Sequence, residues 1–185
     1  AAIKFYQKCI DNKIKPIIGC QIPLTDMLTR KNLGNIILLC QNFSGYKNLI
    51  KLVTQIHLQK KPSENLGATI DLLKKYNEDI LILSGGRNGI LGVNLLASDF
   101  IEKTTLTKTL SEIFIDRMYL QIDRINADSE DVYNSKIIKI SENLRLPLIA
   151  TNNVLFLDHN DYDAHEVRVC INKKIKLEDR VNQKE

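Results

Sequence analysis

The sequence predicts an α/β fold with a mainly parallel sheet, and three observations support that prediction. Five short runs rich in apolar and β-branched residues recur along the chain, helical patterns separate them, and each run is apolar almost throughout. Uninterrupted apolar runs suit strands covered on both faces, as in parallel sheets with crossover helices. Repeated strand–helix patterns are typical of α/β folds. The predicted strands span residues 15–22, 35–41, 79–85, 118–123 and 146–151.

Amphipathic patterns place helices between these strands. Ser44 can cap a helix over 45–58, because a short polar side chain at that position accepts a hydrogen bond from a free backbone N–H. Asp128 can likewise cap a helix over 129–144. In both segments the apolar residues recur at helical spacing and share one stripe. Further helical patterns lie at 68–76, 99–114 and 159–174.

Length and composition are those of a globular protein with a single domain over residues 1–185. Of the 185 residues, 44% are hydrophobic and 26% are charged, which suffices for one core. No apolar run reaches the roughly 18–20 residues that span a bilayer, and the N-terminus lacks the zones of a signal peptide. We therefore expect a cytoplasmic protein. Because the chain opens on a helical pattern without an initiator Met, we also expect a part of a longer protein.

The formal net charge of +4 predicts mild attraction to anions. The two densest basic stretches are residues 58–62 and 171–176, and neither contains an aromatic residue on which a base could stack. We therefore interpret both stretches as solvated surface, with a nucleic-acid patch as the less favoured alternative.

Spacing alone identifies no metal or nucleophile motif. His159 and His165 are six residues apart, whereas a zinc helix spaces its histidines by four. The stretch DYDAHE (161–166) has the composition of a metal site, but carboxylates are also favoured at a helix N-terminus by the helix dipole. We favour the helix start. No C-x-x-C pair is present, which argues against zinc and for reduced thiols at Cys9, Cys20, Cys40 and Cys170.

A glycine-rich stretch, LSGGRNGILG (83–92), follows a predicted strand. Such stretches can cradle phosphate, but this one matches neither G-x-x-x-x-G-K-[ST] nor G-x-G-x-x-G. A tight turn between a strand and a helix also needs small residues that accept positive φ. We interpret the stretch as such a turn.

Four stretches occur in order along the chain: KFYQKCIDNKIKPIIGCQI (4–22), LLCQNFSGYKNLIKLV (38–53), ILILSGGRNG (80–89) and PLIATNNVLFLDHNDYDAHEVRVCI (147–171). Together they resemble the polymerase-and-histidinol-phosphatase (PHP) domain of bacterial replicative DNA polymerase III alpha subunits. The resemblance implies a distorted TIM-like barrel with mainly parallel strands. It also implies that the barrel is incomplete at its N-terminal end, because the family's early His-x-Asp and Thr-Asp motifs do not precede residue 1.

The same resemblance implies that this chain lacks the family's metal ligands. Metal-binding members carry Glu, His and Cys where this chain has Gln21, Asn35 and Gly86, and they carry Asp and His where it has Asn153 and Leu155. Amide, hydrogen and alkyl groups are poor replacements for such ligands. The resemblance therefore predicts no metal, no cofactor and no catalytic residue here, with magnesium serving only the parent polymerase.

The function implied is that of a non-catalytic module in DNA replication. The parent protein would be a DNA-directed DNA polymerase, a nucleotidyltransferase. The module would support the rest of the alpha subunit and dock the proofreading exonuclease. By itself it would bind DNA only weakly, and it would bind no membrane. Two enzymatic alternatives stay open: a metal-dependent PHP phosphoesterase or 3′–5′ exonuclease, which needs two or three ionised ligands, and a stand-alone domain acting on a phosphorylated metabolite.

Overall fold

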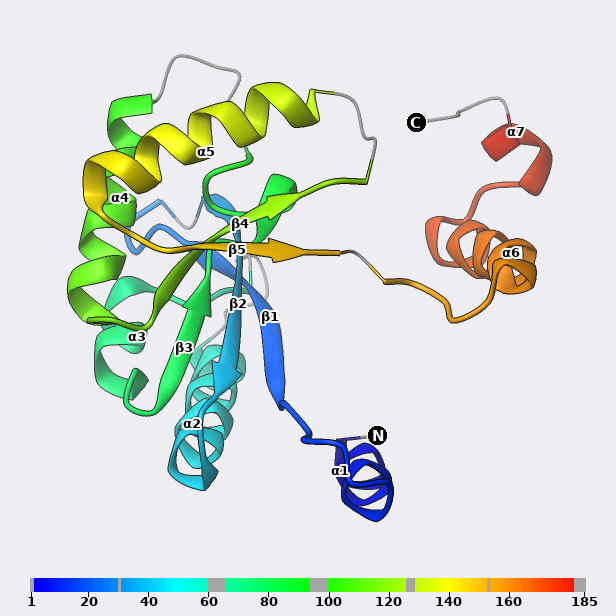
Figure 1. Cartoon of the computed structure of the whole chain (residues 1–185), viewed down its shortest axis with the longest axis horizontal. Coiled ribbons are helices and arrows are strands. Elements are labelled where there is room, and N and C mark those ends of the chain that lie inside the picture. The colour runs from blue at the N-terminus through cyan, green and yellow to red at the C-terminus, as the bar shows by residue number, and fades with distance from the viewer. Residues whose placement is uncertain are drawn as a thin grey trace. The chain divides into compact units, whose positions relative to one another are not determined.

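The computed structural model describes residues 2–29, 31–59, 66–93, 100–125, 129–152 and 154–181. The chain forms two compact units, Ala1–Thr151 and Asn152–Glu185. The larger unit holds a β-sheet with helices, and the smaller unit is helical (Figure 1). In the described ranges, no helix is long and apolar enough to cross a membrane.

A five-stranded sheet lies at the centre of the larger unit, and its strands are neighbours in chain order (Figure 1). All five predicted strands are confirmed, although the first lies several residues further along the chain than predicted. The strands are β1 (Gly19–Thr25), β2 (Asn32–Cys40), β3 (Ile80–Leu83), β4 (Met118–Asp123) and β5 (Leu148–Thr151).

Within this sheet, β2 runs against the direction of the other four strands. It pairs antiparallel with β1 and with β3, whereas β3 with β4 and β4 with β5 are parallel. The predicted mainly parallel sheet is therefore confirmed, with β2 as its one reversed strand among the described strands. Only residues 26–31 connect β1 to β2, and a parallel connection needs about a dozen residues or more. A short connection of that length makes an antiparallel hairpin.

The predicted TIM-like barrel is not what these five strands form on their own. In the described part of the chain they make an open sheet, with β1 and β5 at its two edges. β1 gains one further partner, because Thr25 N donates to Ala68 O and Ala68 N donates to Pro23 O, each at 2.8 Å. The closed form stays a prediction.

The helices occupy the connections, as predicted. One cap differs: Gly45 N donates to Asn42 Oδ1 at 3.0 Å, so Asn42 rather than Ser44 caps the first turn of α2. Asp128 lies outside the described residues. The helices of the larger unit are α1 (Ala2–Asp11), α2 (Phe43–Gln59), α3 (Ile70–Tyr76), α4 (Phe100–Ile113) and α5 (Glu130–Leu144), with a short 3₁₀ turn η1 (Gly86–Asn88). Those of the smaller unit are η2 (His159–Asp161), α6 (Tyr162–Lys173) and α7 (Leu177–Val181).

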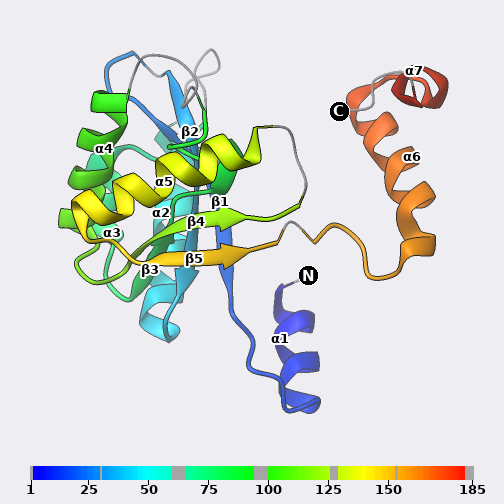
Figure 2. The same cartoon turned by 45° about the horizontal axis from the view of Figure 1, so that its top comes forward.

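The core lies between one face of the sheet and the helices. α2 contacts β1, β2 and β3, α5 contacts β4, and α3 packs against both α2 and α4. Figure 2 shows α5 lying along β4. The strand and helix residues that meet there are fully buried, and they include Leu24, Ile36, Leu38, Leu52, Leu73, Ile80, Ile82, Leu110, Phe114, Met118, Leu120, Ile137 and Ile140. One face of each strand is thereby assigned to the core, which leaves the opposite face for a site.

The four cysteines are free thiols, as the sequence predicts. Cys9 and Cys170 are buried, whereas Cys20 and Cys40 are only half-buried on neighbouring strands. Burial raises the pKa of the Cys20 thiol, and burial together with the nearby Cys20 raises the pKa of Cys40. Both thiols therefore stay protonated and are poor nucleophiles at neutral pH.

Candidate functional site

The face of the sheet opposite the core carries the first two predicted site positions. Successive residues of a strand point to opposite faces, and paired residues share a face. Gln21 pairs with Ile37 and Asn35 pairs with Pro23, while the intervening Ile36 is fully buried in the core. Following the register across the sheet gives the residues of this face, which we call the open face: Gln21, Asn35, Ile37, Leu83, Tyr119, Gln121, Asp123, Ile149 and Thr151.

Gly86 joins these positions at the carboxyl end of β3. The loop after β3 packs on β2, because Ile90 N donates to Asn35 O at 3.1 Å. Gly86 has φ +63°, and a Cβ at this residue would lie 2.8 Å from Asp123 Oδ2. The positive φ therefore favours glycine at this position, and a larger side chain would displace the Asp123 carboxylate. The interpretation of 83–92 as a tight turn is confirmed, with the turn leading into η1.

A chain of hydrogen bonds links three elements at this end of the sheet. Gly85 N donates to Gln121 Oε1 at 2.5 Å, and Gln121 Nε2 donates to Thr151 Oγ1 at 3.1 Å. The Thr151 hydroxyl in turn donates to Asp123 Oδ1 at 2.5 Å. The chain runs from the loop through β4 to β5, and each donor is matched to an acceptor. Gln121 is only 5% exposed, so these bonds are shielded from water and fix the strand ends in place.

Ser84, directly after β3, and two residues of α5 hold the backbone of β4. Gln121 N donates to Ser84 Oγ and the Tyr133 hydroxyl donates to Gln121 O, both at 2.9 Å. Asn134 Nδ2 donates to Asp123 O at 2.9 Å. Burial, and then the charge of Asp123, raises the pKa of Tyr133 well above the usual tyrosine range. The phenol therefore stays neutral and serves as a hydrogen-bond donor.

Chemically, this arrangement offers amides, hydroxyls and one carboxylate. Metal catalysis needs several ionised or imidazole ligands that converge on one point. Among the described residues, no three His, Cys, Asp or Glu side chains come close enough together to hold a metal ion. The carboxylate of Asp123 already accepts from Thr151, so the network is suited to bracing the strand ends.

The remaining two predicted positions lie elsewhere. Leu155 belongs to the smaller unit, where its side chain is 50% exposed. Asn153 lies outside the described residues. The structure therefore brings together Gln21, Asn35 and Gly86 in one unit of the chain, and the pairing of Asn153 and Leu155 with them stays a prediction.

Carboxylates of the smaller unit cap η2, the 3₁₀ turn that leads into α6, and the stretch 161–166 forms the first turn of α6 as predicted. Asn160 N donates to Asp158 Oδ1 at 3.1 Å, and Asp158 N donates to Asp161 Oδ2 at 3.2 Å. This reciprocal pair is a capping box, which satisfies backbone donors at a helix N-terminus. The ring of His165 packs 5.6 Å from that of Phe156. These residues therefore act in local structure.

Sequence reasoning missed Gln121 and Asp123. The available signal was their place at the carboxyl end of an apolar run, where polar side chains of parallel strands collect. Thr151 stands at the equivalent end of the next strand and pairs with Asp123 in register. The two strands are parallel neighbours, so their polar ends meet at one edge of the sheet.

The hydroxyl of Tyr133 should contribute measurably to stability. Tyr133→Phe leaves the buried Gln121 carbonyl without this donor, so we expect the free energy of unfolding to fall by about 1–2 kcal/mol in urea denaturation at pH 7. Tyr133 has a higher pKa in the folded protein than in the unfolded chain, where a tyrosine titrates near pH 10. Its contribution to the free energy of unfolding is therefore complete below about pH 10 and is lost as the pH rises above that value. The difference in the free energy of unfolding between the unchanged protein and Tyr133→Phe should therefore narrow above about pH 10. Tyr76→Phe is the control, and an equal loss there would contradict the prediction.

Comparison with known sequences identifies the family of this chain. The family model for the PHP domain matches residues 1–125. DNA polymerase III subunit alpha of Haemophilus influenzae is 32% identical over 177 residues, and that of Escherichia coli strain K12 is also 32% identical over 177 residues. The subunit of Buchnera aphidicola is 33% identical over 173 residues. These matches cover 96%, 96% and 92% of this chain but 15% of each relative. The chain belongs to the PHP domain family, in the form found in DNA polymerase III alpha subunits.

Proposed function

We propose that the chain is a non-catalytic PHP module of a replicative DNA polymerase alpha subunit, which acts in DNA replication as a structural support. The observation that carries the proposal is the identity of the groups on the open face. By the resemblance, Gln21, Asn35 and Gly86 stand where metal-binding members carry ligands. The neighbouring Gln121 donates to Thr151, so both side chains are already engaged in hydrogen bonds. Amides and hydroxyls fixed in this way brace a fold and supply no acid, base or metal ligand.

The partner of this support would be the rest of the alpha subunit. On the open face, Ile37, Tyr119 and Ile149 are only half-buried within this unit. Further strands that joined the free edge of β5 would bury these side chains and complete the TIM-like barrel. The polymerase activity, with its magnesium ions, would then belong to other parts of the protein, and the compartment would be the cytoplasm.

A second proposed partner is the proofreading exonuclease, which the resemblance to the polymerase family implies. The same replacement of ligands supports it, since a module without its own metal site needs a separate nuclease for proofreading. The enzymatic alternative, a metal-dependent phosphoesterase or 3′–5′ exonuclease, has one observation in its favour. Asp123 is a carboxylate on the open face, and its Oδ2 lies beside Gly86.

Metal analysis coupled to a hydrolysis assay separates the two functions. We expect the purified chain, dialysed after exposure to zinc and manganese, to retain far less than one ion per molecule. We also expect no release of nucleotides from the 3′ end of a labelled single strand with magnesium, manganese or zinc. Asp123→Asn is the matched variant, because it removes the one carboxylate and keeps its shape. Near-stoichiometric metal and hydrolysis that are both lost in this variant, with its circular dichroism unchanged, would establish the enzymatic alternative instead.

A further inference from the structure

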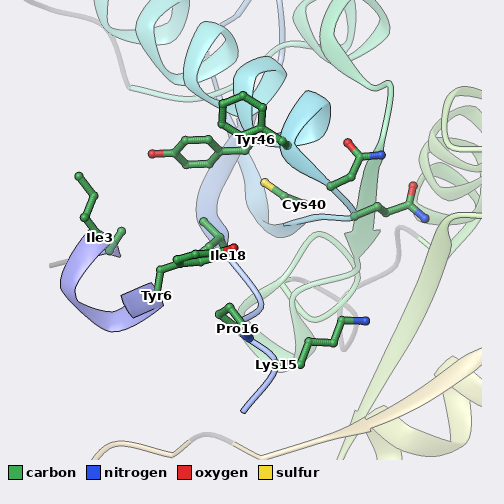
Figure 3. A pocket seen from close by; sticks show the side chains of 11 residues that line it. Ile3, Tyr6, Lys15, Pro16, Ile18, Cys40 and Tyr46 are labelled. Atoms are coloured by element: carbon green, nitrogen blue, oxygen red, sulfur yellow. The ribbon is translucent and has the colours of Figure 1, made fainter. Parts of the chain in front are cut away.

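A pocket of about 530 Å³ lies between α1, the segment that leads into β1, and the start of α2 (Figure 3). It is separate from the open face, and neither the network around Gln121 nor the proposed support role uses it. Ile3, Pro16, Ile18 and Cys40 give it apolar walls. Its volume falls within the roughly 300–1,000 Å³ typical of sites for small molecules.

Three aromatic rings border this pocket. Phe43 and Tyr46 lie on the first turn of α2, with ring centroids 6.2 Å apart and planes inclined by 26°. Tyr6 reaches the pocket from α1, on the opposite side (Figure 3). Phe43 is 69% exposed and Tyr6 is 49% exposed, so both rings present open faces to a ligand. Exposed rings across a gap offer flat surfaces on which a planar ligand can stack.

Two lysines supply positive charge at this pocket. Lys15 lines the pocket, and the ammonium group of Lys47 lies 4.6 Å from the centroid of the Phe43 ring. None of the lining residues is an aspartate or a glutamate. The pocket therefore attracts an anion, and the aromatic residues that the basic stretches 58–62 and 171–176 lack are present here.

Two amide side chains complete the chemistry. Gln41 and Asn42 lie in the lining: the Gln41 amide offers a donor and an acceptor, and Asn42, whose Oδ1 caps α2, offers its Nδ2 as a donor. Bases of single strands are recognised by stacking on aromatic rings, by hydrogen bonds to their edges and by lysine contacts to phosphate. An apolar peptide anchor would use the walls but would leave the amides and the lysines unused. The combination of rings, amides and lysines favours a nucleotide.

We propose that this pocket binds one base of single-stranded DNA. The base stacks on Tyr6 and on the Phe43 ring, and the adjacent phosphates contact Lys15 and Lys47. Because lysines make the phosphate contacts, binding is weak and strongly dependent on salt. The site is an addition to the support function and does not depend on it.

Fluorescence anisotropy with a labelled oligothymidine strand tests the site, using the whole 185-residue chain at low salt. Tyr6→Ala and Phe43→Ala should each weaken binding by about tenfold, since base stacking on one ring is worth roughly that much. Tyr162→Ala is the matched control, because Tyr162 is 48% exposed and lies far along the chain in α6. Its affinity should be unchanged. Thermal melts of all variants should coincide, because the replaced side chains are exposed.

Charge variants give an independent measure. Lys15→Gln should reduce the slope of log K against log salt by about 0.7, the value for one phosphate contact on a single strand. Lys139→Gln removes the same charge from an exposed position on α5 and should leave that slope unchanged. Equal slopes in the two variants would mean that binding is diffuse and would overturn the proposal.

Two further probes distinguish other occupants. Displacement of the strand by thymidine monophosphate at similar concentrations would assign the pocket to a free nucleotide and overturn the strand proposal. Binding of an alternating Glu–Leu peptide that depends on Tyr6, with no binding of the oligonucleotide, would assign it to a protein segment and also overturn the proposal. Failure of both competitors, with loss of affinity in Tyr6→Ala and Phe43→Ala, supports the site.

Discussion

Phe114→Ala should lower the free energy of unfolding by about 3–5 kcal/mol, the usual cost of removing a buried aromatic ring and leaving a cavity. Phe114 directly follows α4 and is 1% exposed, among the largest side chains that are fully buried. The guanidinium of Arg117 lies 5.7 Å from the ring centroid. The same Arg117 donates to Asn77 O at 2.5 Å and to Ile80 O at 3.0 Å. Loss of the ring therefore also loosens the group that ties the start of β4 to the start of β3.

Equilibrium denaturation in urea measures this effect, and the adjacent residue provides the control. Ile115 is 67% exposed, so Ile115→Ala should change the free energy of unfolding by no more than about 0.5 kcal/mol. Phe114→Leu keeps much of the buried volume, so its loss of stability should lie between those of Phe114→Ala and Ile115→Ala. If Phe114→Ala and Ile115→Ala lost the same stability, Phe114 would not be the core residue that the structure shows.

The sequence predicted the existence of the strands better than their limits or directions. The first strand was predicted at 15–22 from its apolar run, yet β1 runs from Gly19 to Thr25 and includes Pro23. A proline is accepted on an edge strand, where it needs no ladder partner for its nitrogen, and Pro23 still accepts a hydrogen bond through its carbonyl. Local pattern cannot distinguish an edge strand from a central one, so this boundary needed the structure.

The direction of β2 could not be predicted from the local hydrophobic pattern either. Its apolar run resembles a strand buried on both faces, which favours a parallel sheet. In the structure Ile36 and Leu38 are fully buried while Ile37 and Leu39 are half-buried, so the two faces of the strand differ. The half-buried face belongs to the open face, and both kinds of environment select aliphatic residues. Hydrophobicity alone therefore did not reveal which strand was reversed.

The site was predictable in part, through resemblance. The resemblance placed Gln21, Asn35 and Gly86 at the family's ligand positions, which stays a prediction, and the strand register puts the first two on one face of the sheet. The residues that hold this region together were not predicted, because Gln121 lies 36 residues from its partner Gly85 and 30 from Thr151. Side-chain hydrogen bonds over such separations are set by strand register, and a single sequence does not specify that register.

Gly34→Ala should also lower the free energy of unfolding strongly, by about 3 kcal/mol, and should act directly on the open face. Gly34 has φ +119°, and an added Cβ would lie 2.6 Å from the backbone of Gly89. Backbone strain of this kind costs about 1–3 kcal/mol, and forced overpacking costs about as much again. The obstacle is backbone, so no side chain can move aside to relieve it. We expect the loop that carries Gly86 to be displaced from β2.

Two measurements together identify that displacement. Thermal melting reports the global loss, and limited trypsin digestion reports the loop, since Arg87 is the basic residue within η1. Cleavage after Arg87 should accelerate in Gly34→Ala under conditions where the protein is still folded, because local opening exposes the loop before the core unfolds. Lys31→Ala, an exposed change just before β2, should alter neither the melting temperature nor this cleavage rate. A large loss of stability without faster cleavage at Arg87 would show that the strain spreads through the sheet and that the contact between β2 and the loop does not hold Gly86 in place.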